Sequence, residues 1–366
     1  MIKNTVLLLF IALLILGGTV WILTTQQPET VSLQLTEESE AFKNPGREKP
    51  LLDFIEAFFL VEDTLLMRTS LVEEREMMAT GEEVLSESIG LYMEYFRRRE
   101  KENEFHQLVT LLEKYFVCEE KLIAWKINPS EMNSKEPTIN APVDDLRIIN
   151  QLIIAHEKWE GYGYADLARV LADALYVHSV REKQMLVFNH PEAEVAPLVY
   201  NDFEALLRLS KMDDRWQKVL QKALHHTLEQ QISGVPFYKD DYWVNQGLVE
   251  EGEYLVLENL WIMYYKATIG VKDKEALEWL VVQMDQGPVL GRYRLTEESF
   301  SGNESPAIYG VISRIAKIYE DEQLYLLATE ALDRMVTKEG IYAGGFVDSL
   351  TGQAYSYDQL ISLLGY

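Results

Sequence analysis

The chain contains a single cysteine, Cys118, among its 366 residues, and this scarcity excludes several kinds of site. One cysteine forms no intrachain disulfide, and it supplies neither a cysteine zinc cluster nor a thiol redox pair. Histidine is scarce as well, and the six histidines include no HExxH arrangement of the kind that binds catalytic zinc. We therefore expect a protein that works without a metal or another cofactor.

Basic residues are also in short supply. The 34 lysines and arginines face 59 aspartates and glutamates, so the formal net charge is -25. This excess of negative charge repels a phosphate backbone, and nucleic acid is not an expected partner. A solvated acidic surface that keeps the protein soluble is the simpler explanation of the charge.

Charge of either sign is missing from one long stretch, residues 6–23, which follows Lys3. Eighteen uncharged residues are enough to span a bilayer, and the lysine before them favours an exported domain. A cleaved signal peptide is the alternative, although no A-x-A site follows and no cysteine offers a site for lipid attachment. We expect a transmembrane anchor or signal segment over 1–24, a polar linker over 25–50, and one domain over 51–366.

Alternating runs typical of β-strands are few, and the rest of the chain is a succession of amphipathic segments. The sequence therefore predicts an all-α protein. No period of about 34 or 40 residues recurs, which disfavours a solenoid and leaves paired helices around a closed core. The expected helices are about 51–60, 87–99, 103–117, 145–157, 163–178, 200–210, 213–229, 253–268, 273–284, 304–319, 322–337 and 355–364.

Acidic residues stand directly before apolar helices at three places: Glu87, the pair Asp144 and Asp145, and Glu304. Each is explained by helix-start chemistry alone, because an acid in the first turn complements the helix dipole. If the helices alternate in direction around a ring, the same acids can instead gather around one cleft. Both interpretations remain open from the residues themselves.

Aromatic residues lie near these acids and in the loops that precede them. Aromatic rings with polar edges suit the apolar C–H faces and hydroxyl rims of sugars, although core packing explains any single one equally well. Carboxylates, aromatics and the lack of a Ser-His-Asp pattern together indicate glycosidic-bond chemistry, which needs one protonated carboxyl and one carboxylate. The aromatics in question are Tyr92, Trp125, Tyr200, Tyr242, Trp243, Tyr293, Tyr309, Tyr355 and Tyr357.

Several motifs carry a resemblance to a known family. "SESIGLYM", with Ser86, Glu87, Gly90 and Met93, resembles the Ser-Glu motif of the family 8 glycoside hydrolases. "LIAWKI" followed by "NAPVDDLRIINQLIIAHEKW" is similar to that family's Trp segment and Asp-containing helix, and "GGFVDSLTGQAYSYDQLISLLG" fits its last helical pair. The likeness covers roughly residues 50 to 366. It is strongest to exported, membrane-anchored members associated with exopolysaccharide operons.

This resemblance implies an (α/α)6 barrel, a six-hairpin toroid, that cleaves β-linked polysaccharide with inversion and without a metal. Glu87 matches the proton donor, and the Asp144–Asp145 pair matches the segment whose acid contacts the sugar at the cleavage subsite. The stretch that carries the family's usual base offers Glu304 in place of aspartate, with Asp348 as the next candidate. The residues expected to contact the sugar are Trp125, Tyr92, Tyr200, Tyr309, Arg147 and Asp348.

Two other functions share such a barrel. A non-catalytic barrel could bind glycan within an exopolysaccharide synthesis complex, and the replacement of the usual aspartate by Glu304 keeps this alternative open. A polysaccharide lyase or uronyl hydrolase would need a basic cleft for its anionic sugar, and few arginines or lysines cluster near the acids. Reducing-sugar release separates a hydrolase from a binder, and absorbance of an unsaturated product reveals a lyase.

Overall fold

The computed structural model describes residues 33–74, 79–131, 139–190, 193, 197–239 and 249–366. Its contacts divide the chain into two units, 1–34 and 35–366, and the helical fold is that of the second. The expected anchor over 1–24 lies outside the described residues. Within the described ranges, none of the helices has the length and apolar character required to cross a membrane.

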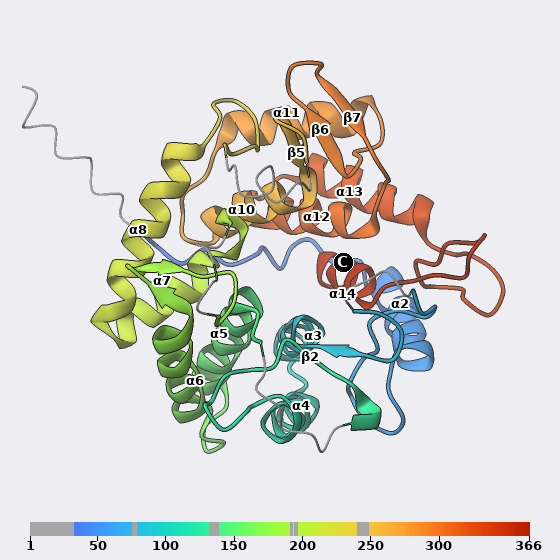
Figure 1. The fold of residues 1–366 in the computed structure, drawn as a ribbon. Coiled ribbons are helices and arrows are strands. Elements are labelled where there is room, and N and C mark those ends of the chain that lie inside the picture. The colour runs from blue at the N-terminus through green and yellow to red at the C-terminus, as the bar shows by residue number, and fades with distance from the viewer. Residues whose placement is uncertain (1–32, 75–78, 132–138, 191–192, 194–196, 240–248) are drawn as a thin grey trace, which may run out of the picture. The chain divides into compact units, whose positions relative to one another are not determined.

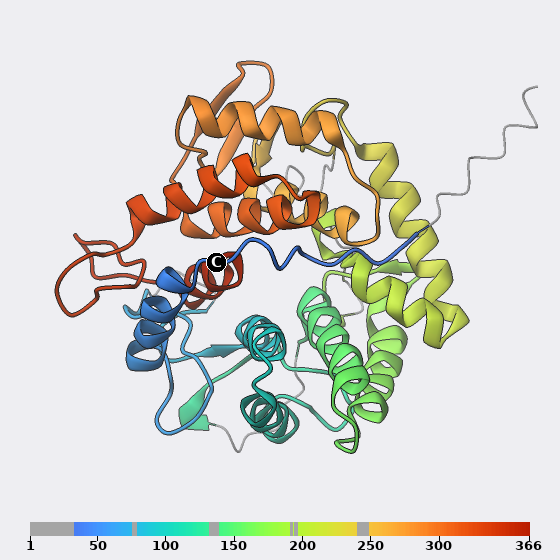
Figure 2. The same cartoon turned by 180° about the vertical axis from the view of Figure 1, so that it is seen from behind.

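Six helices form a closed inner ring in the order of the chain (Figures 1 and 2). Each packs against the next inner helix, and the last returns to pack against the first. The inner helices are α3 (Ser86–Arg98), α5 (Pro142–Lys158), α7 (Phe203–Met212), α10 (Val256–Thr268), α12 (Pro306–Tyr319) and α14 (Ser356–Gly365).

Six further helices form an outer layer and connect the inner ones. Each outer helix leads the chain back from the end of one inner helix to the start of the next, so successive inner helices begin at the same end of the barrel. The outer helices are α2 (Pro45–Phe58), α4 (Glu102–Tyr115), α6 (Tyr164–Ser179), α8 (Asp214–Gln230), α11 (Lys274–Gln286) and α13 (Glu322–Met335).

The two layers differ in how their side chains are buried. The outer helix α4 buries Phe105, Leu108, Val109 and Leu112, which form one apolar stripe at helical spacing. In the inner helix α12, every residue from Pro306 to Ile318 is buried. A helix that is buried on all sides lies inside a fold, so the inner ring is the core of this barrel.

Close approach between two inner helices depends on a glycine. A Cβ atom placed on Gly310 of α12 would lie 2.8 Å from the carbonyl oxygen of Ile361 in α14, which is closer than real Cβ atoms come. The neighbouring atom is backbone and cannot rotate away. Glycine at this position therefore lets α12 and α14 pack against each other and close the ring.

The twelve described α-helices correspond one to one to the twelve segments expected from the sequence, and the all-α prediction is confirmed. The largest boundary difference is at α2, which begins at Pro45 rather than at residue 51 because proline fits the first position of a helix. Residues 35–50, expected to belong to a linker, are part of the helical unit instead.

Short strands pair the loops between helices. Strand β1 (Val84–Leu85) pairs with β2 (Lys126–Ile127) in antiparallel register, directly before α3. The remaining strands are β3 (Val180–Arg181) with β4 (Gln184–Met185), and the three-stranded sheet β5 (Glu253–Leu255), β6 (Arg292–Arg294) and β7 (Ser299–Ser301). They lie at the end of the barrel where the inner helices begin.

The opposite end of the ring is crossed by the extended segment 35–44, which Figure 2 shows in front of the inner helices. Its backbone amides at Thr36, Ser39 and Asn44 donate to carbonyl oxygens at the C-terminal ends of α10, α12 and α14 respectively. Last-turn carbonyls of a helix lack partners within the helix. The segment supplies partners to three of them and covers this end of the barrel.

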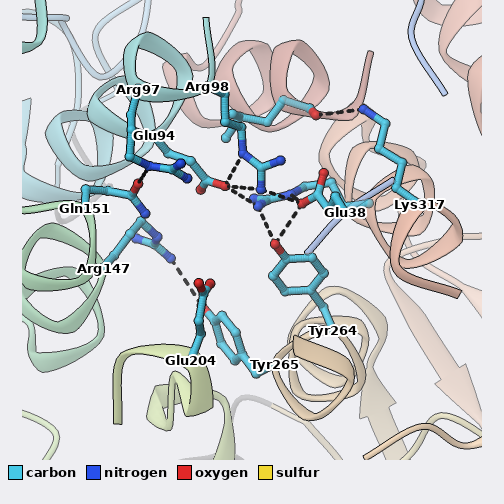
Figure 3. Close-up of polar contacts among 12 residues, drawn as sticks. Glu38, Glu94, Arg97, Arg98, Arg147, Gln151, Glu204, Tyr264, Tyr265 and Lys317 are labelled. Carbon is cyan, nitrogen blue, oxygen red and sulfur yellow. Dashed lines mark hydrogen bonds and ion pairs between the residues drawn. The ribbon is translucent and has the colours of Figure 1, made fainter. Parts of the chain in front are cut away.

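A buried ion cluster ties this segment to the ring (Figure 3). The Glu38 carboxylate accepts hydrogen bonds from Arg314 Nε at 2.8 Å, Arg98 Nη2 at 2.9 Å and the Tyr264 hydroxyl at 2.8 Å, and Glu94 accepts from both arginines. Burial by itself raises the pKa of Glu38, but the surrounding cations Arg314, Arg98 and Lys317 lower it to about 2. The cluster joins α3, α10 and α12 to the crossing segment.

Candidate active site

A pocket of about 390 Å³ opens at the end of the barrel where the inner helices begin. Its residues come from α3, α5, α10 and α14, from the short 3₁₀-helix η2 (Leu198–Tyr200) before α7, and from the loop before β2 that carries Trp125. Its polar and aromatic lining consists of Glu87, Trp125, Asp144, Arg147, Tyr200, Glu258, Trp261, Tyr265 and Tyr357. Side chains far apart in the sequence therefore share one concave site of a size that suits a ligand.

Glu87 is the second residue of α3 and lines this pocket. The β1–β2 pairing leads directly into the helix, and the Ser86 amide donates to the Trp125 carbonyl oxygen at 2.9 Å. This bond holds the start of α3 beside the loop that carries the Trp125 ring. The carboxyl and the aromatic ring thus reach the same pocket from two connected segments.

The Glu87 carboxyl is kept in its protonated form at neutral pH. Burial in the pocket wall contributes most, and the negative charges of Asp144 and Asp358 add to it, while Arg147 opposes them; together they raise the pKa of Glu87 to about 8. A carboxylic acid that is neutral at pH 7 can donate a proton to a leaving oxygen. Glu87 thus has the protonation state that a general acid requires.

Asp144 also lines the pocket, and both of its carboxylate oxygens have partners. Ser86 donates to Oδ2 at 3.0 Å, and Arg147 Nη1 donates to Oδ1 at 2.8 Å. Arg147 packs over Gly90, where a Cβ would lie 3.1 Å from the arginine side chain. The glycine in the Ser-Glu motif thus leaves room for the arginine that holds Asp144 beside Glu87.

Asp145 points away from the pocket. Its Oδ2 accepts from Asn140 Nδ2 at 2.6 Å, and the same amide donates to the Ser179 hydroxyl at the end of α6. Consecutive residues of a helix project about 100° apart, so two neighbouring aspartates cannot share one direction. Of the pair, the structure brings Asp144 together with Glu87 and places Asp145 between α5 and α6.

Aromatic rings and an arginine form the wall between α10 and α14. Trp261 Nε1 donates to the Tyr357 hydroxyl at 2.7 Å, and the Arg147 guanidinium lies 5.8 Å from the centre of the Trp261 ring. Tyr265 stacks on Trp261 with ring centres 5.2 Å apart. These contacts fix the planes of the rings, as a surface for binding the faces of sugars requires.

Glu304 lies outside this pocket, two residues before α12. Its Oε1 accepts a hydrogen bond from the Tyr309 hydroxyl and lies 3.6 Å from Arg334 Nη2. Tyr309 in turn accepts from the Val289 amide at 3.2 Å. The carboxylate expected to be the base is thus hydrogen-bonded to a tyrosine of α12, the helix that follows it.

Of the six residues expected to contact sugar, three line the pocket and three do not. Trp125, Tyr200 and Arg147 line the pocket, whereas Tyr92, Tyr309 and Asp348 do not. Tyr92 is buried with its ring 4.1 Å from that of Phe96, Tyr309 is fully buried, and Asp348 accepts from the backbone amides of the loop that it begins. Tyr242 and Trp243 fall among residues that the structure does not describe.

Comparison with known proteins bears on this architecture. No family model matches the chain. A relative, YdaJ of Bacillus subtilis (strain 168), whose name includes the word lipoprotein, is 23% identical over 76% of this chain and 78% of its own length. One similar solved structure is a novel alpha-amylase from Clostridium perfringens, with 26% identity and a TM-score of 0.79 over 87% of this chain and 96% of that one. Another is PssZ from Listeria monocytogenes, with 19% identity and a TM-score of 0.64 over 91% of this chain and 96% of that one.

A further similar structure is endoglucanase Cel10 from Klebsiella pneumoniae, a family 8 glycosyl hydrolase, with 14% identity and a TM-score of 0.58 over 86% of this chain and 97% of that one. Residues 35–366 have the fold of the family 8 glycoside hydrolases. The resemblance found in the sequence motifs is confirmed, and so is the (α/α)6 toroid that it implied. Within this family 8 fold, the pocket lies where the inner helices begin.

Some pocket residues of this family 8 fold were not expected from the sequence. Glu258, Trp261 and Tyr265 follow one another at spacings of three and four in α10, so they lie on one face of that helix. Asp358 occupies the first turn of α14, where it accepts from Ser305 Oγ at 2.8 Å and influences Glu87. An acid three residues into an apolar helix, followed by aromatics on the same face, is the signal that could have indicated α10.

Metal binding finds no support among the described residues, where no three acidic, histidine or cysteine side chains gather closely enough to hold an ion. Asp144 is partnered by the Ser86 hydroxyl and the Arg147 guanidinium, and Asp358 by the Ser305 hydroxyl.

We predict that Asp144→Asn lowers turnover about 10- to 100-fold, as expected from losing the roughly 1.5–3 kcal/mol of a hydrogen bond to a charged group. The same change removes a negative charge that raises the Glu87 pKa, so the alkaline limb of activity should move to lower pH. Asp145→Asn is the matched control, because it keeps an oxygen for Asn140 and leaves the pocket unchanged. Profiles of kcat/KM against pH measure both effects; identical profiles for the two variants would contradict the assignment.

Proposed function

We propose that the protein is an endo-acting glycoside hydrolase that cleaves a polysaccharide with inversion, using Glu87 as general acid. The observation that carries the proposal is the protonated Glu87 carboxyl at the wall of an aromatic pocket. Trp125, Trp261 and Tyr357 offer faces for sugar rings beside that acid. The family 8 fold supports the same reaction type.

Two classes of linkage are proposed as substrates. A β-linked polysaccharide is the first, because the sequence motifs resemble those of β-glycan hydrolases and because Cel10 is named an endoglucanase. An α-linked glucan is the second, because the similar structure from Clostridium perfringens is named an alpha-amylase. Both proteins share the barrel with this chain, so the substrate panel must contain both anomeric types.

The test incubates the full chain with soluble starch, carboxymethylcellulose, xylan and chitosan. Release of reducing ends together with an early fall in viscosity supports an endo-acting hydrolase, and NMR of the first product gives its anomeric configuration. Binding to a polysaccharide without release of reducing ends would support the non-catalytic barrel instead. Absorbance from an unsaturated product would identify a lyase.

We further propose that the barrel is exported and held at the membrane, in keeping with the uncharged run after Lys3 and with the word lipoprotein in the name of YdaJ. Because Cys118 is the only cysteine, the uncharged run itself would serve as the anchor. Protease added to intact cells should therefore remove the barrel, while a cytoplasmic control protein survives. Full protection of the barrel until the cells are lysed would refute this orientation.

A further inference from the structure

Three carboxyl groups line the pocket, a fourth, Asp358, follows the lining residue Tyr357, and the four differ in how their oxygens are occupied. Asp144 is held by Ser86 and Arg147, and Asp358 is held by Ser305 and by the Ala307 amide. In the part of the chain that the structure describes, no ion pair or side-chain hydrogen bond engages the carboxyl of Glu87 or of Glu258, and both line the pocket. Two carboxyls are thus held in place, and two face the space where a ligand would lie.

The two carboxyls that face the pocket stand on opposite walls. Glu87 is on α3 and Glu258 is in the first turn of α10. Around the inner ring, α3 is followed by α5, α7 and then α10, so these helices are three places apart in a ring of six. The space between the two side chains is the pocket itself. In inverting hydrolases the two carboxyls stand about 6.5–9.5 Å apart across the substrate, because a water must fit between the base and the sugar.

Glu258 shares its helix face with the aromatic wall. Trp261 and Tyr265 lie one and two turns further along the same face, and Tyr357 is bonded to Trp261 from α14. A sugar ring resting on this wall would have Glu87 on one side and Glu258 on the other. The wall therefore aligns the bond to be cleaved between the two carboxyls.

The charged neighbours of the two groups also differ, although the positive Arg147 acts on Glu87 as well. The neighbours that act on Glu87 include the negative Asp144 and Asp358, whereas the charge that acts on Glu258 is the positive Arg292. Burial raises the pKa of Glu258, and a hydrogen bond from its own backbone amide and the charge of Arg292 oppose only part of this rise. Two carboxyls with different charged neighbours are a pair between which acid and base roles can be divided.

We propose that Glu258 is the general base of the hydrolysis, on α10 rather than at the start of α12. This inference rests on the proposed function. It departs from the expectation that Glu304 takes the role, and the contacts of Glu304 support the departure. The Glu304 carboxylate is bonded to Tyr309 and lies near Arg334, outside the pocket that holds Glu87.

The step balances with these two groups and one water. Glu258 removes a proton from the water, whose oxygen forms a bond to the anomeric carbon from the side opposite the leaving group. The glycosidic C–O bond breaks, its electron pair goes to the leaving oxygen, and that oxygen takes the proton of Glu87. The products are a new hydroxyl end and a reducing end of inverted configuration, and solvent returns the proton from Glu258 to Glu87.

The experiment compares Glu258→Gln, Glu258→Ala and Glu304→Gln in the full chain, with Glu251→Gln as an exposed control seven residues before Glu258. Thermal melting of each variant reports folding. Activity is measured as reducing ends released from soluble starch, carboxymethylcellulose, xylan and chitosan. Sodium azide is then added to Glu258→Ala, because azide attacks the anomeric carbon without needing a base to remove a proton.

We expect Glu258→Gln to lower kcat/KM about 10²–10⁴-fold, the usual effect of losing a general base, and to remove the acidic limb of the pH profile. Azide should restore cleavage by Glu258→Ala and give a glycosyl azide of inverted configuration. Glu304→Gln should stay within a few-fold of the parent. If Glu258→Gln keeps the parent activity, or if Glu304→Gln is the variant that loses it, the base assignment is wrong.

The same measurements separate this inference from the function on which it rests. If Glu87→Gln loses activity and Glu258→Gln keeps it, the proposal of a hydrolase holds and only the assignment of Glu258 as general base is wrong. A parent protein that releases reducing ends from none of the four polysaccharides overturns both. A folded Glu258→Asp variant with partial activity supports the assignment, because it keeps a carboxylate at a shorter reach.

Discussion

Glu87→Gln is expected to lower kcat/KM on a polysaccharide about 10²–10⁴-fold while leaving the fold intact. The amide has the shape of the carboxyl but carries no proton that it can transfer to the leaving oxygen. No side-chain hydrogen bond among the described residues depends on Glu87, so its replacement should leave the melting temperature close to that of the parent. The loss would therefore belong to the chemical step.

The pH dependence of the parent tests the same role independently. Since the group must be protonated to act and its pKa is raised to about 8, kcat/KM should hold through neutral pH and fall as the pH rises through about 8. A solvated glutamic acid would lose its proton far below neutrality, at a pKa of about 4.3. An activity that has vanished by pH 6 would contradict the environment assigned to Glu87.

Two comparisons sharpen the experiment. Glu82→Gln is the matched control, because Glu82 is exposed on the loop that leads into α3, where it pairs with Arg68 at the surface. An aryl glycoside with an activated leaving group provides the second comparison, since its departure needs little help from an acid. Glu87→Gln should cleave that substrate far better than it cleaves the polysaccharide, and equal losses on both substrates would argue for a general structural defect.

Arg314→Met is expected to reduce the free energy of unfolding by about 3–5 kcal/mol. The arginine is buried at the centre of the ring, where it donates to Glu38 and Glu94. Methionine fills much of its volume but leaves these two carboxylates close together, with Arg98 as their remaining shared cation. Breaking a buried pair from one side is costly because the remaining charge stays away from water.

Urea denaturation of three variants measures this effect. Lys49→Met breaks an exposed ion pair with Asp53 in α2 and should leave the denaturation midpoint almost unchanged. The double variant Arg314→Met with Glu38→Gln should recover part of the loss, because it also removes one of the unpaired charges. An Arg314→Met midpoint equal to that of the parent would show that the cluster does not stabilise the barrel.

The class of the fold could be read from the sequence because it depends on local patterns. Apolar periodicity identified each of the twelve described helices, and the acid that follows Ser86 marked the start of α3. Local motifs also carried the family resemblance, since "SESIGLYM" contains both Glu87 and the Gly90 over which Arg147 packs. Hydrophobic spacing and helix-start chemistry act over a few residues, so these signals can be recognised in the sequence alone.

The membership of the pocket was decided by the tertiary structure. Asp144 and Asp145 are equal as helix-start acids, and only the rotation of α5 against α3 directs one to Ser86 and the other to Asn140. Inner helices are buried on nearly all sides, polar residues included, so the exposed face that reveals the rotation of a surface helix is missing from their sequences. For the same reason Glu258 was not among the acids singled out from the sequence, and only the ring placed α10 opposite α3.

The longest contacts were the least visible in the sequence. Glu38 bonds to Arg314, which is 276 positions away in the chain. The segment that carries Glu38 was expected to be a linker because its composition is polar, as is that of many linkers. By itself, the sequence determined the twelve described helices and the acid at the start of α3. Which carboxyls face each other, and which residues seal the far end of the barrel, were decided when the ring closed, because those pairings depend on helix rotation and order around the ring rather than on neighbouring residues.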